Sequence, residues 1–300
     1  MTPPRREATV VTSNDGVRIE CSTQGDGPGL VLVHGGMQTA RSFDVLASAL
    51  VCSYRVVRYD RRGRGRNAAG GSDDGGDRFT RDTNDLVAVV DATEARYVFG
   101  LSSGAILTMG AALASSRVEK IVLYEPPLAM GGVDPGDFSE AFLAALARDR
   151  LGAAMATIIK GTGDREPLTH VPRFVLSLLF GRAIRNGVMA PIGESLRDLL
   201  LTMPADIAVQ RQGSKTLAPL SRLSTPTLLL GGDRSNPKLN HVLDCIEHEL
   251  PNVRRTTIHG SGHLAADNEG KPEDVARAID AFLQAPTALP SSSWPPLGAW

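Results

Sequence analysis

The sequence predicts an α/β protein in which helices flank a mostly parallel sheet and an all-helical cap is inserted into the chain. Short apolar runs alternate with longer segments of helical periodicity up to residue 125 and again after residue 222. Between these stretches, residues 126–222 show helical patterns and no convincing strand. Because hydrophobic residues make up 42% of the 300-residue chain, it can bury a large core.

The apolar runs of the first part are expected to be strands. The run over residues 29–34 (GLVLVH) is apolar throughout, which is typical of a parallel strand covered on both faces. The earlier run over residues 17–21 is expected to form a hairpin with residues 8–12. The other strands expected here are residues 54–59, 96–100 and 119–124, and the expected helices are residues 41–50 and 80–93.

The remaining patterns predict the cap and the end of the sheet. The expected cap helices are residues 138–150, 153–160, 171–184 and 194–203. Strands at residues 226–230 and 254–259 then alternate with helices at residues 239–250 and 271–283. We therefore expect a core of residues 1–125 and 223–284, a cap over residues 126–222, and a Pro- and Ser-rich tail over residues 285–300. A connection as long as the cap is best interpreted as a lid over a site.

The charge balance narrows the classes of partner. Lys and Arg number 32 against 33 Asp and Glu, so a dedicated binder of nucleic acid or of an anionic membrane is not expected. The 3 cysteines are too few and too scattered for a disulfide framework or a zinc cluster. Neither a secretory signal nor a membrane-spanning apolar run is visible. We expect a cytoplasmic protein, a possible homodimer, that acts on a small molecule without cofactor or metal.

An arginine cluster follows the run at residues 54–59. It contains Arg58, Arg61, Arg62, Arg64 and Arg66. Because an aspartate lies among the arginines, more aspartates follow, and two glycines mark a turn, we interpret the cluster as a structural loop and not as a patch for polyanions.

The most specific local pattern is G-x-S-x-G at residues 100–104, where an expected strand meets an expected helix. This context is that of a nucleophile elbow, in which the flanking glycines let strand and helix pack around a sharp turn. Ser102 would be lifted to the edge of the sheet as the nucleophile. The backbone N–H of Ser103 would then point toward a developing oxyanion.

A serine hydroxyl needs a base, and His263 is the best candidate. It lies in Gly-Ser-Gly-His between the last expected strand and the last expected helix, so it should reach the same sheet edge as Ser102. His34-Gly35-Gly36-Met37 also follows a buried strand. The Gly36 N–H is the expected second oxyanion donor, and Met37 is expected to line the pocket.

With these motifs the chain resembles proteins of the α/β-hydrolase fold that carry a helical cap. The matching segments, in the order typical of that family, are residues 34–36, 59–67, 100–104, 123–127, 226–233 and 260–263. The resemblance implies an α/β-hydrolase sheet and a catalytic triad in the order nucleophile, acid, histidine. The family often has serine where this chain has Asn67, a change expected to alter only a hydrogen bond within a loop.

The resemblance leaves the triad acid open between two carboxylates. Family members commonly carry the acid in G-x-x-D after the penultimate strand, but Asp233 does not fit that spacing from Gly232. Glu125, which ends the strand at residues 119–124, matches the position used by some relatives. We favour Glu125 slightly and keep Asp233 as the alternative.

Serine at the elbow favours acyl transfer to water: a serine hydrolase that cleaves an ester, thioester or lactone of a small, largely apolar substrate through an acyl-enzyme. The residues expected to contact the substrate are Met37, Leu101, Phe138, Phe142 and Phe174. A C–C bond hydrolase or a biosynthetic enzyme that transfers or cyclises an acyl group is the alternative on the same scaffold. A non-catalytic ligand-binding protein is the second alternative.

Overall fold

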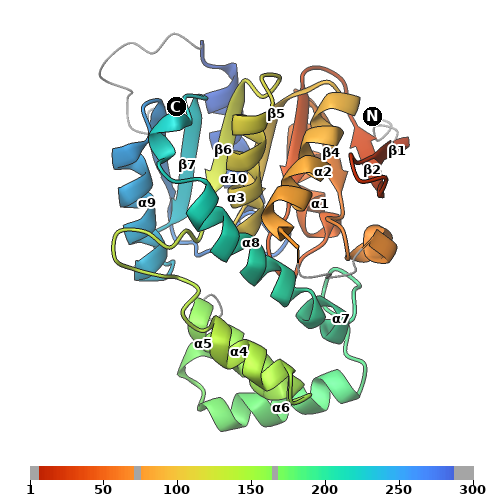
Figure 1. The fold of residues 1–300 in the computed structure, drawn as a ribbon, viewed down its shortest axis with the longest axis vertical. Helices are drawn as coiled ribbons and strands as arrows, with labels where there is room; N and C mark the ends of the chain where they lie inside the picture. The colour runs from red at the N-terminus through yellow and green to blue at the C-terminus, as the bar shows by residue number, and fades with distance from the viewer. Residues whose placement is uncertain (1–6, 71–75, 164–167, 287–300) are drawn as a thin grey trace.

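The computed structural model describes residues 7–70, 76–163 and 168–286, without the side chains of residues 68–70. These residues form one sheet of 8 strands in the order β1-β2-β4-β3-β5-β6-β7-β8, with helices on both faces (Figure 1). The strands are β1 Glu7–Thr12, β2 Arg18–Gln24, β3 Gly29–Val33, β4 Arg55–Tyr59, β5 Ala95–Leu101, β6 Lys120–Tyr124, β7 Thr227–Gly232 and β8 Val253–Ile258. The predicted fold class is confirmed.

Strand direction follows the hydropathy pattern. β1 and β2 form the predicted antiparallel hairpin, and β2 pairs antiparallel with β4. All other pairs in the sheet are parallel. Every residue of the central strands β3 and β6 is buried, because helices cover both faces there. This explains the apolar run of β3 and that of β6 after Lys120.

The core helices form two layers. Helices α2, α3 and α9 pack their apolar side chains against one face of the sheet. Helices α1 and α10 pack against the opposite face. The bounds are α1 Asp44–Leu50, α2 Arg78–Ala92, α3 Ser103–Ala114, α9 Pro237–Glu249 and α10 Pro272–Gln284. Short 3-10 helices lie at Ala40–Phe43, Gly65–Gly70, Leu168–His170 and Leu220–Arg222.

The described residues between β6 and β7 form five α-helices, and we use the name cap for residues 126–222. They are α4 Ser139–Leu146, α5 Leu151–Thr162, α6 Arg173–Arg185, α7 Leu196–Leu201 and α8 Met203–Thr216. In the described part of the cap only two isolated β-bridges occur, as expected. Helices α4 to α6 project away from the sheet, whereas α8 lies along the core (Figure 1) and contacts α2 and α3.

The sequence patterns missed α8. The pattern over residues 194–203 corresponds to α7, and a second helix begins directly after it, with Pro204 in its first turn. Proline fits there because the first N–H groups of a helix have no partner within it. The expected tail lies outside the described residues from residue 287 onward, and no described helix is long and apolar enough to cross a membrane.

Candidate active site

The turn between β5 and α3 has the geometry of an elbow. Ser102 has φ 56° and ψ −124°, a conformation that is strained for any residue with a side chain. Its N–H donates to the Tyr124 carbonyl at 2.9 Å, which ties the turn to the end of β6. A side chain at Gly104 would collide with the Val33 carbonyl, and one at Gly100 with Thr108, so both glycines are required by packing.

The His34–Met37 segment passes directly beside this turn. A Cβ atom at Gly35 would lie 3.0 Å from the Cβ of Ser102. The Gly35 N–H donates to Gln38 Oε1 at 2.6 Å. Within the described chain, neither the Gly36 N–H nor the Ser103 N–H donates to another protein group. Two N–H groups without a protein acceptor therefore lie in Ser103 and in the segment that passes beside Ser102.

The structure brings Glu125 and His263 together. His263 Nδ1 lies 2.7 Å from Glu125 Oε2, and the two side chains are 9% and 0% exposed. The other carboxylate oxygen of Glu125 accepts the Gly232 N–H at 2.7 Å. Tyr124 donates its hydroxyl to the Gly262 carbonyl at 2.8 Å, which fixes the loop before the histidine. A proton held on Nδ1 by Glu125 leaves Nε2 as the basic nitrogen of the ring.

Asp233 lies in a different environment. Its carboxylate accepts the Gly260 N–H at 2.7 Å and lies 3.3 Å from Nδ1 of His259. The side chain is 41% exposed, and that of His259 is 86% exposed. Asp233 therefore fixes the loop after β8 at the surface, whereas Glu125 contacts the histidine predicted as base.

The predicted substrate-contacting residues do not form one wall. Met37 and Phe138 are partly buried and pack against the apolar cluster of the cap. Leu101, in contrast, is buried in the core on the side of α1 and α10, and Phe142 is fully buried inside the cap. Phe174 is 68% exposed. A contact of Leu101, Phe142 or Phe174 with the substrate therefore stays a prediction, and none of these three side chains shares a surface with Met37.

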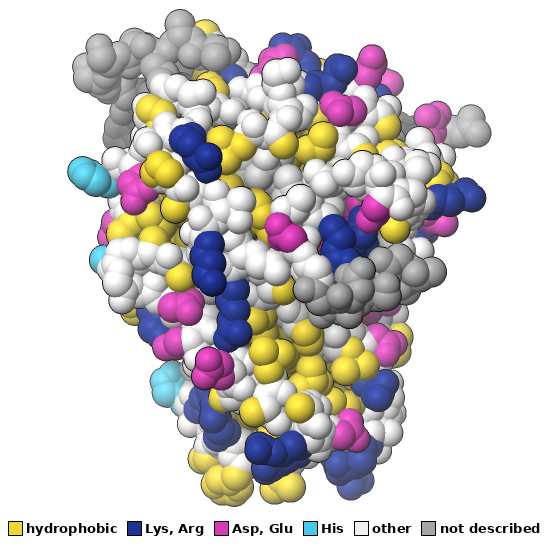
Figure 2. All heavy atoms as spheres, in the orientation of Figure 1, with side chains coloured by type: hydrophobic (Ala, Val, Ile, Leu, Met, Phe, Trp, Pro, Cys, Tyr) yellow, Lys and Arg dark blue, Asp and Glu magenta, His cyan; other side chains and the backbone are white. Residues whose placement is uncertain are grey.

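The physical reason lies in the helical pattern, which marks apolar faces without saying what covers them. In α6 the buried side chains are Leu176 and Ile184, and the exposed apolar ones are Phe174, Leu178 and Leu179. Figure 2 shows hydrophobic side chains at the end of the cap, where Figure 1 places α6.

The arginine cluster is a structural loop, as the sequence predicted. Arg62 pairs with Asp85 at 2.5 Å and with Asp15 at 2.7 Å. Arg61 is fully buried and pairs with Asp82 at 3.0 Å. The loop is also tied to β2 at the position where the family often has serine: Asn67 Oδ1 accepts the Glu20 N–H at 2.9 Å.

Asp206 is the polar residue that the sequence patterns missed. Its carboxylate lies 2.9 Å from Arg61 and 2.7 Å from Arg64, and it accepts the Ser103 hydroxyl at 2.7 Å. Burial acts to raise the pKa of Asp206, but the Arg64 and Arg61 guanidiniums outweigh it and lower that pKa to about 2. In the sequence the arginine cluster has aspartates within it and after it, so no pattern pointed to a carboxylate in the cap.

His34 is a structural histidine. It is fully buried and its Nε2 accepts the Arg61 backbone N–H at 3.1 Å, while Nδ1 lies 3.0 Å from the Gly35 carbonyl. Burial, with Arg64 and Arg61 close by, holds the pKa of His34 well below its usual value. The ring is therefore neutral, and its Nδ1–H donates to Gly35.

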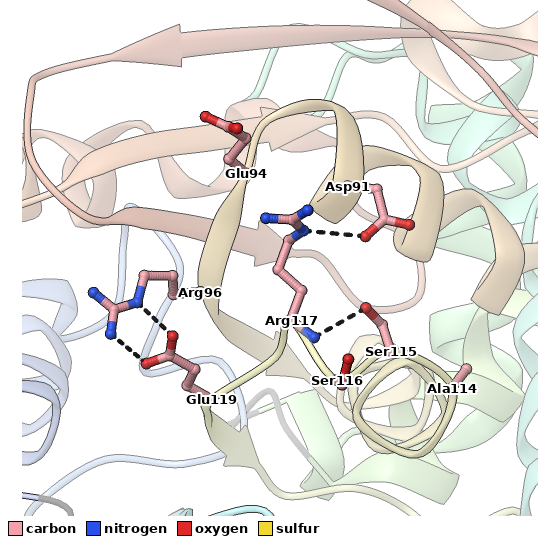
Figure 3. Close-up of a pocket in the computed structure, with 8 residues that line it drawn as sticks. All are labelled: Asp91, Glu94, Arg96, Ala114, Ser115, Ser116, Arg117 and Glu119. Carbon is pink, nitrogen blue, oxygen red and sulfur yellow. Dashed lines mark hydrogen bonds and ion pairs between the residues drawn. The ribbon is translucent and has the colours of Figure 1, made fainter.

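A separate polar depression of about 760 Å³ (Figure 3) lies where β5 and β6 begin, whereas Ser102 and Glu125 follow the ends of these strands. Arg96 and Glu119 form a bidentate pair in it, and Arg117 lies 3.4 Å from Asp91. These ion pairs are solvent-exposed, and no histidine or cysteine lines the depression. It offers no nucleophile with a base. Among the described residues no cluster of His, Cys, Asp and Glu could hold a metal ion.

Comparisons with known proteins identify the fold and the family. A crystal structure described as an alpha/beta hydrolase from Sphaerobacter thermophilus has a TM-score of 0.70 and 28% identity, covering 92% of this chain and 100% of that one. A curated relative, "Uncharacterized hydrolase YraK" of Bacillus subtilis, is 34% identical over 116 residues, 38% of this chain and 42% of the relative. The "3-hydroxybutyrate-oligomer hydrolase" of Cupriavidus necator is 33% identical over 156 residues, 51% of this chain and 48% of the relative.

The chain thus matches less than half the length of these two curated relatives. The match to a family model is broader and covers both parts of the core together with the cap. Residues 30–278 match the model described as "Alpha/beta hydrolase family". This protein therefore belongs to the alpha/beta hydrolase family.

Proposed function

We propose that the protein is a serine hydrolase that cleaves an ester, thioester or lactone of a small, largely apolar substrate. The observation that carries the proposal is the buried 2.7 Å pair between His263 and Glu125, at the same edge of the sheet as the strained Ser102. The unused Gly36 and Ser103 N–H groups add the electrostatic part of the site.

The residues perform acyl transfer in two halves. In the first half, Ser102 Oγ attacks the substrate carbonyl carbon while His263 Nε2 takes the hydroxyl proton. The Gly36 and Ser103 N–H groups stabilise the oxyanion, and Glu125 stabilises the imidazolium. His263 then gives the proton to the leaving alcohol, thiol or ring oxygen, and the acyl-enzyme forms. In the second half, His263 activates a water that releases the acid and regenerates Ser102.

Support for an apolar substrate comes from the cap, and support for an ester comes from the name of one relative. Met37 follows the oxyanion segment, by which we mean His34–Gly36, and it packs against the apolar cluster of the cap. One curated relative is named a hydrolase of 3-hydroxybutyrate oligomers. We therefore propose that the acyl group of the substrate lies beside Ser102, in contact with Met37 and the apolar cluster of the cap.

The test joins active-site labelling with turnover. Intact mass after treatment with a fluorophosphonate probe should show one added phosphonyl group in the wild type and none in Ser102→Ala. Hydrolysis of p-nitrophenyl esters of increasing chain length should fall by about 10⁶-fold in the same variant. Ser115→Ala, in the depression of Figure 3, is the matched control and should behave as wild type.

Two results would change the proposal. A folded wild type that takes up no label contradicts a nucleophilic Ser102. Labelling of Ser102 without turnover of any ester contradicts ester hydrolysis and favours acyl transfer or C–C bond hydrolysis at the same serine.

A further inference from the structure

We propose that Asp206, on cap helix α8, is a positioning residue that holds both oxyanion donors in place. The inference rests on the proposed function, because it takes the Gly36 and Ser103 N–H groups as those donors. It gives α8 a role beyond covering the site, because the oxyanion site is complete only when this helix is packed in the position seen here. The argument has three steps, each carried by a buried contact.

The first step is the geometry of one peptide unit. Arg64 Nη1 donates to the Gly35 carbonyl at 2.9 Å. That carbonyl and the Gly36 N–H belong to the same peptide, which is trans and planar, so the two groups point in opposite directions. Fixing the carbonyl therefore fixes the direction of the N–H. A cationic donor on the carbonyl also polarises the peptide and strengthens its N–H as a donor.

The second step is that one carboxylate joins the supports of both donors. Asp206 Oδ2 lies 2.7 Å from Arg64 Nη2, and Asp206 Oδ1 accepts the Ser103 hydroxyl at 2.7 Å. Arg61 Nη1 also bonds Asp206 Oδ1 and the Ser103 hydroxyl, at 2.9 and 3.0 Å. Asp206 is 5% exposed, so these bonds form away from bulk water and are strong. Its loss would remove one bond from Arg64 and one from the Ser103 hydroxyl at the same time.

The third step is that Asp206 comes from the cap. It lies in the first turn of α8, which packs on α2 and α3 of the core. A side chain at Gly36 would come within 3.0 Å of Met203 Sδ and 3.3 Å of the Asp206 carboxylate. The first turn of α8 therefore lies directly on the oxyanion segment, and a displacement of α8 would remove the carboxylate from Arg64 and Ser103.

The test compares two variants of the network with a control on the same helix. Asp206→Asn keeps the size of the side chain and removes its charge. Arg64→Met removes the charged one of the two donors to the Gly35 carbonyl and leaves the bond from His34 Nδ1. The control is Gln212→Ala, because Gln212 Oε1 accepts the Phe79 N–H at 2.9 Å and so ties α8 to α2 away from the site. Ser103→Ala breaks one bond of Asp206 and serves if Asp206→Asn does not fold.

The first measurement uses amide resonances of Gly36 and Ser103 in heteronuclear NMR spectra, and it needs no substrate. We expect both resonances to move in Asp206→Asn, only that of Gly36 to move strongly in Arg64→Met, and neither to move in Gln212→Ala. If Asp206→Asn folds and its Gly36 and Ser103 amide resonances are unchanged, the inference is overturned. If Asp206→Asn does not fold, unchanged amide resonances in both Ser103→Ala and Arg64→Met overturn it.

The second measurement separates kcat from KM with p-nitrophenyl esters. We expect kcat to fall by about 10- to 100-fold in Asp206→Asn, with KM within about 3-fold of wild type, because the donors act on the transition state. Affinity for a trifluoromethyl ketone, whose adduct carries an oxyanion, should fall in parallel. An equal loss of kcat in Gln212→Ala would mean that Asp206 only holds the cap in place, and it would overturn the inference.

If the wild type takes no label and cleaves no ester, the proposed function fails, and the amide resonances still decide whether Asp206 positions the two N–H groups.

Discussion

Two carboxylate–histidine pairs lie near the same edge of the sheet, and they differ in burial. Glu125 and His263 are 2.7 Å apart, with 0% and 9% of their side chains exposed. Asp233 and His259 are 3.3 Å apart, with 41% and 86% exposed. Away from water the first pair is held by strong electrostatics, whereas water screens the second. The comparison teaches that burial, and not the presence of an acid near a histidine, decides which pair can orient a catalytic ring.

Backbone structure explains why the two pairs differ. Glu125 directly follows β6 with φ 44°, and its second oxygen is occupied by the Gly232 N–H from β7. The carboxylate is therefore anchored between two central strands. Asp233 also directly follows its strand, β7, but its carboxylate accepts the N–H of Gly260 in the loop after β8.

The largest expected effect tests the pairs directly. Glu125→Gln should lower kcat by about 10,000-fold while the protein remains folded, since the amide no longer holds the His263 tautomer and its positive charge. Asp233→Asn should leave kcat close to the wild-type value. Ester turnover of the two variants, with circular dichroism as the folding control, measures the difference. Loss of activity in Asp233→Asn alone would reverse our assignment of the acid.

The same contrast of burial applies to two phenylalanines of the cap. Phe142→Ala should lower the free energy of unfolding by about 3–5 kcal/mol, because it opens a cavity in the apolar cluster of the cap. Phe174→Ala should change it by no more than about 0.5 kcal/mol, because the ring is exposed. Urea unfolding of both variants provides the measurement. A large loss of stability for Phe174→Ala would mean that a contact covers α6 in solution.

The smallest expected effect is the pH dependence that Asp206 contributes. Its pKa is depressed from 3.8 to about 2 in the folded state, so its stabilisation is full above the unfolded value and is lost as the pH falls toward 2. Between pH 5 and pH 2 the wild type should lose about 2 kcal/mol more free energy of unfolding than Asp206→Asn. Parallel curves for the two proteins over this range, from urea unfolding at each pH, would contradict a charged contact at Asp206.

Sequence patterns predicted the elements well where the signal is local. The buried strands β3 and β6 were visible as apolar runs, and the elbow was visible because Gly100 and Gly104 are required by packing at fixed spacing. Helix α8 was missed because α7 and α8 follow one another without a loop, so their patterns merge. The apolar faces of α4 and α6 were visible, but not which of their side chains are covered.

The sequence by itself determined the fold class, the place of the serine elbow and the histidine that follows the last strand, since each depends on neighbouring residues and on glycine spacing. The tertiary structure decided which carboxylate meets His263 and which one neutralises Arg61 and Arg64. The physical reason is distance along the chain: Glu125 and His263 are 138 residues apart, and Arg64 and Asp206 are 142 apart. Such partners are selected by the packing of strand ends and of α8 against the core, which no local pattern encodes.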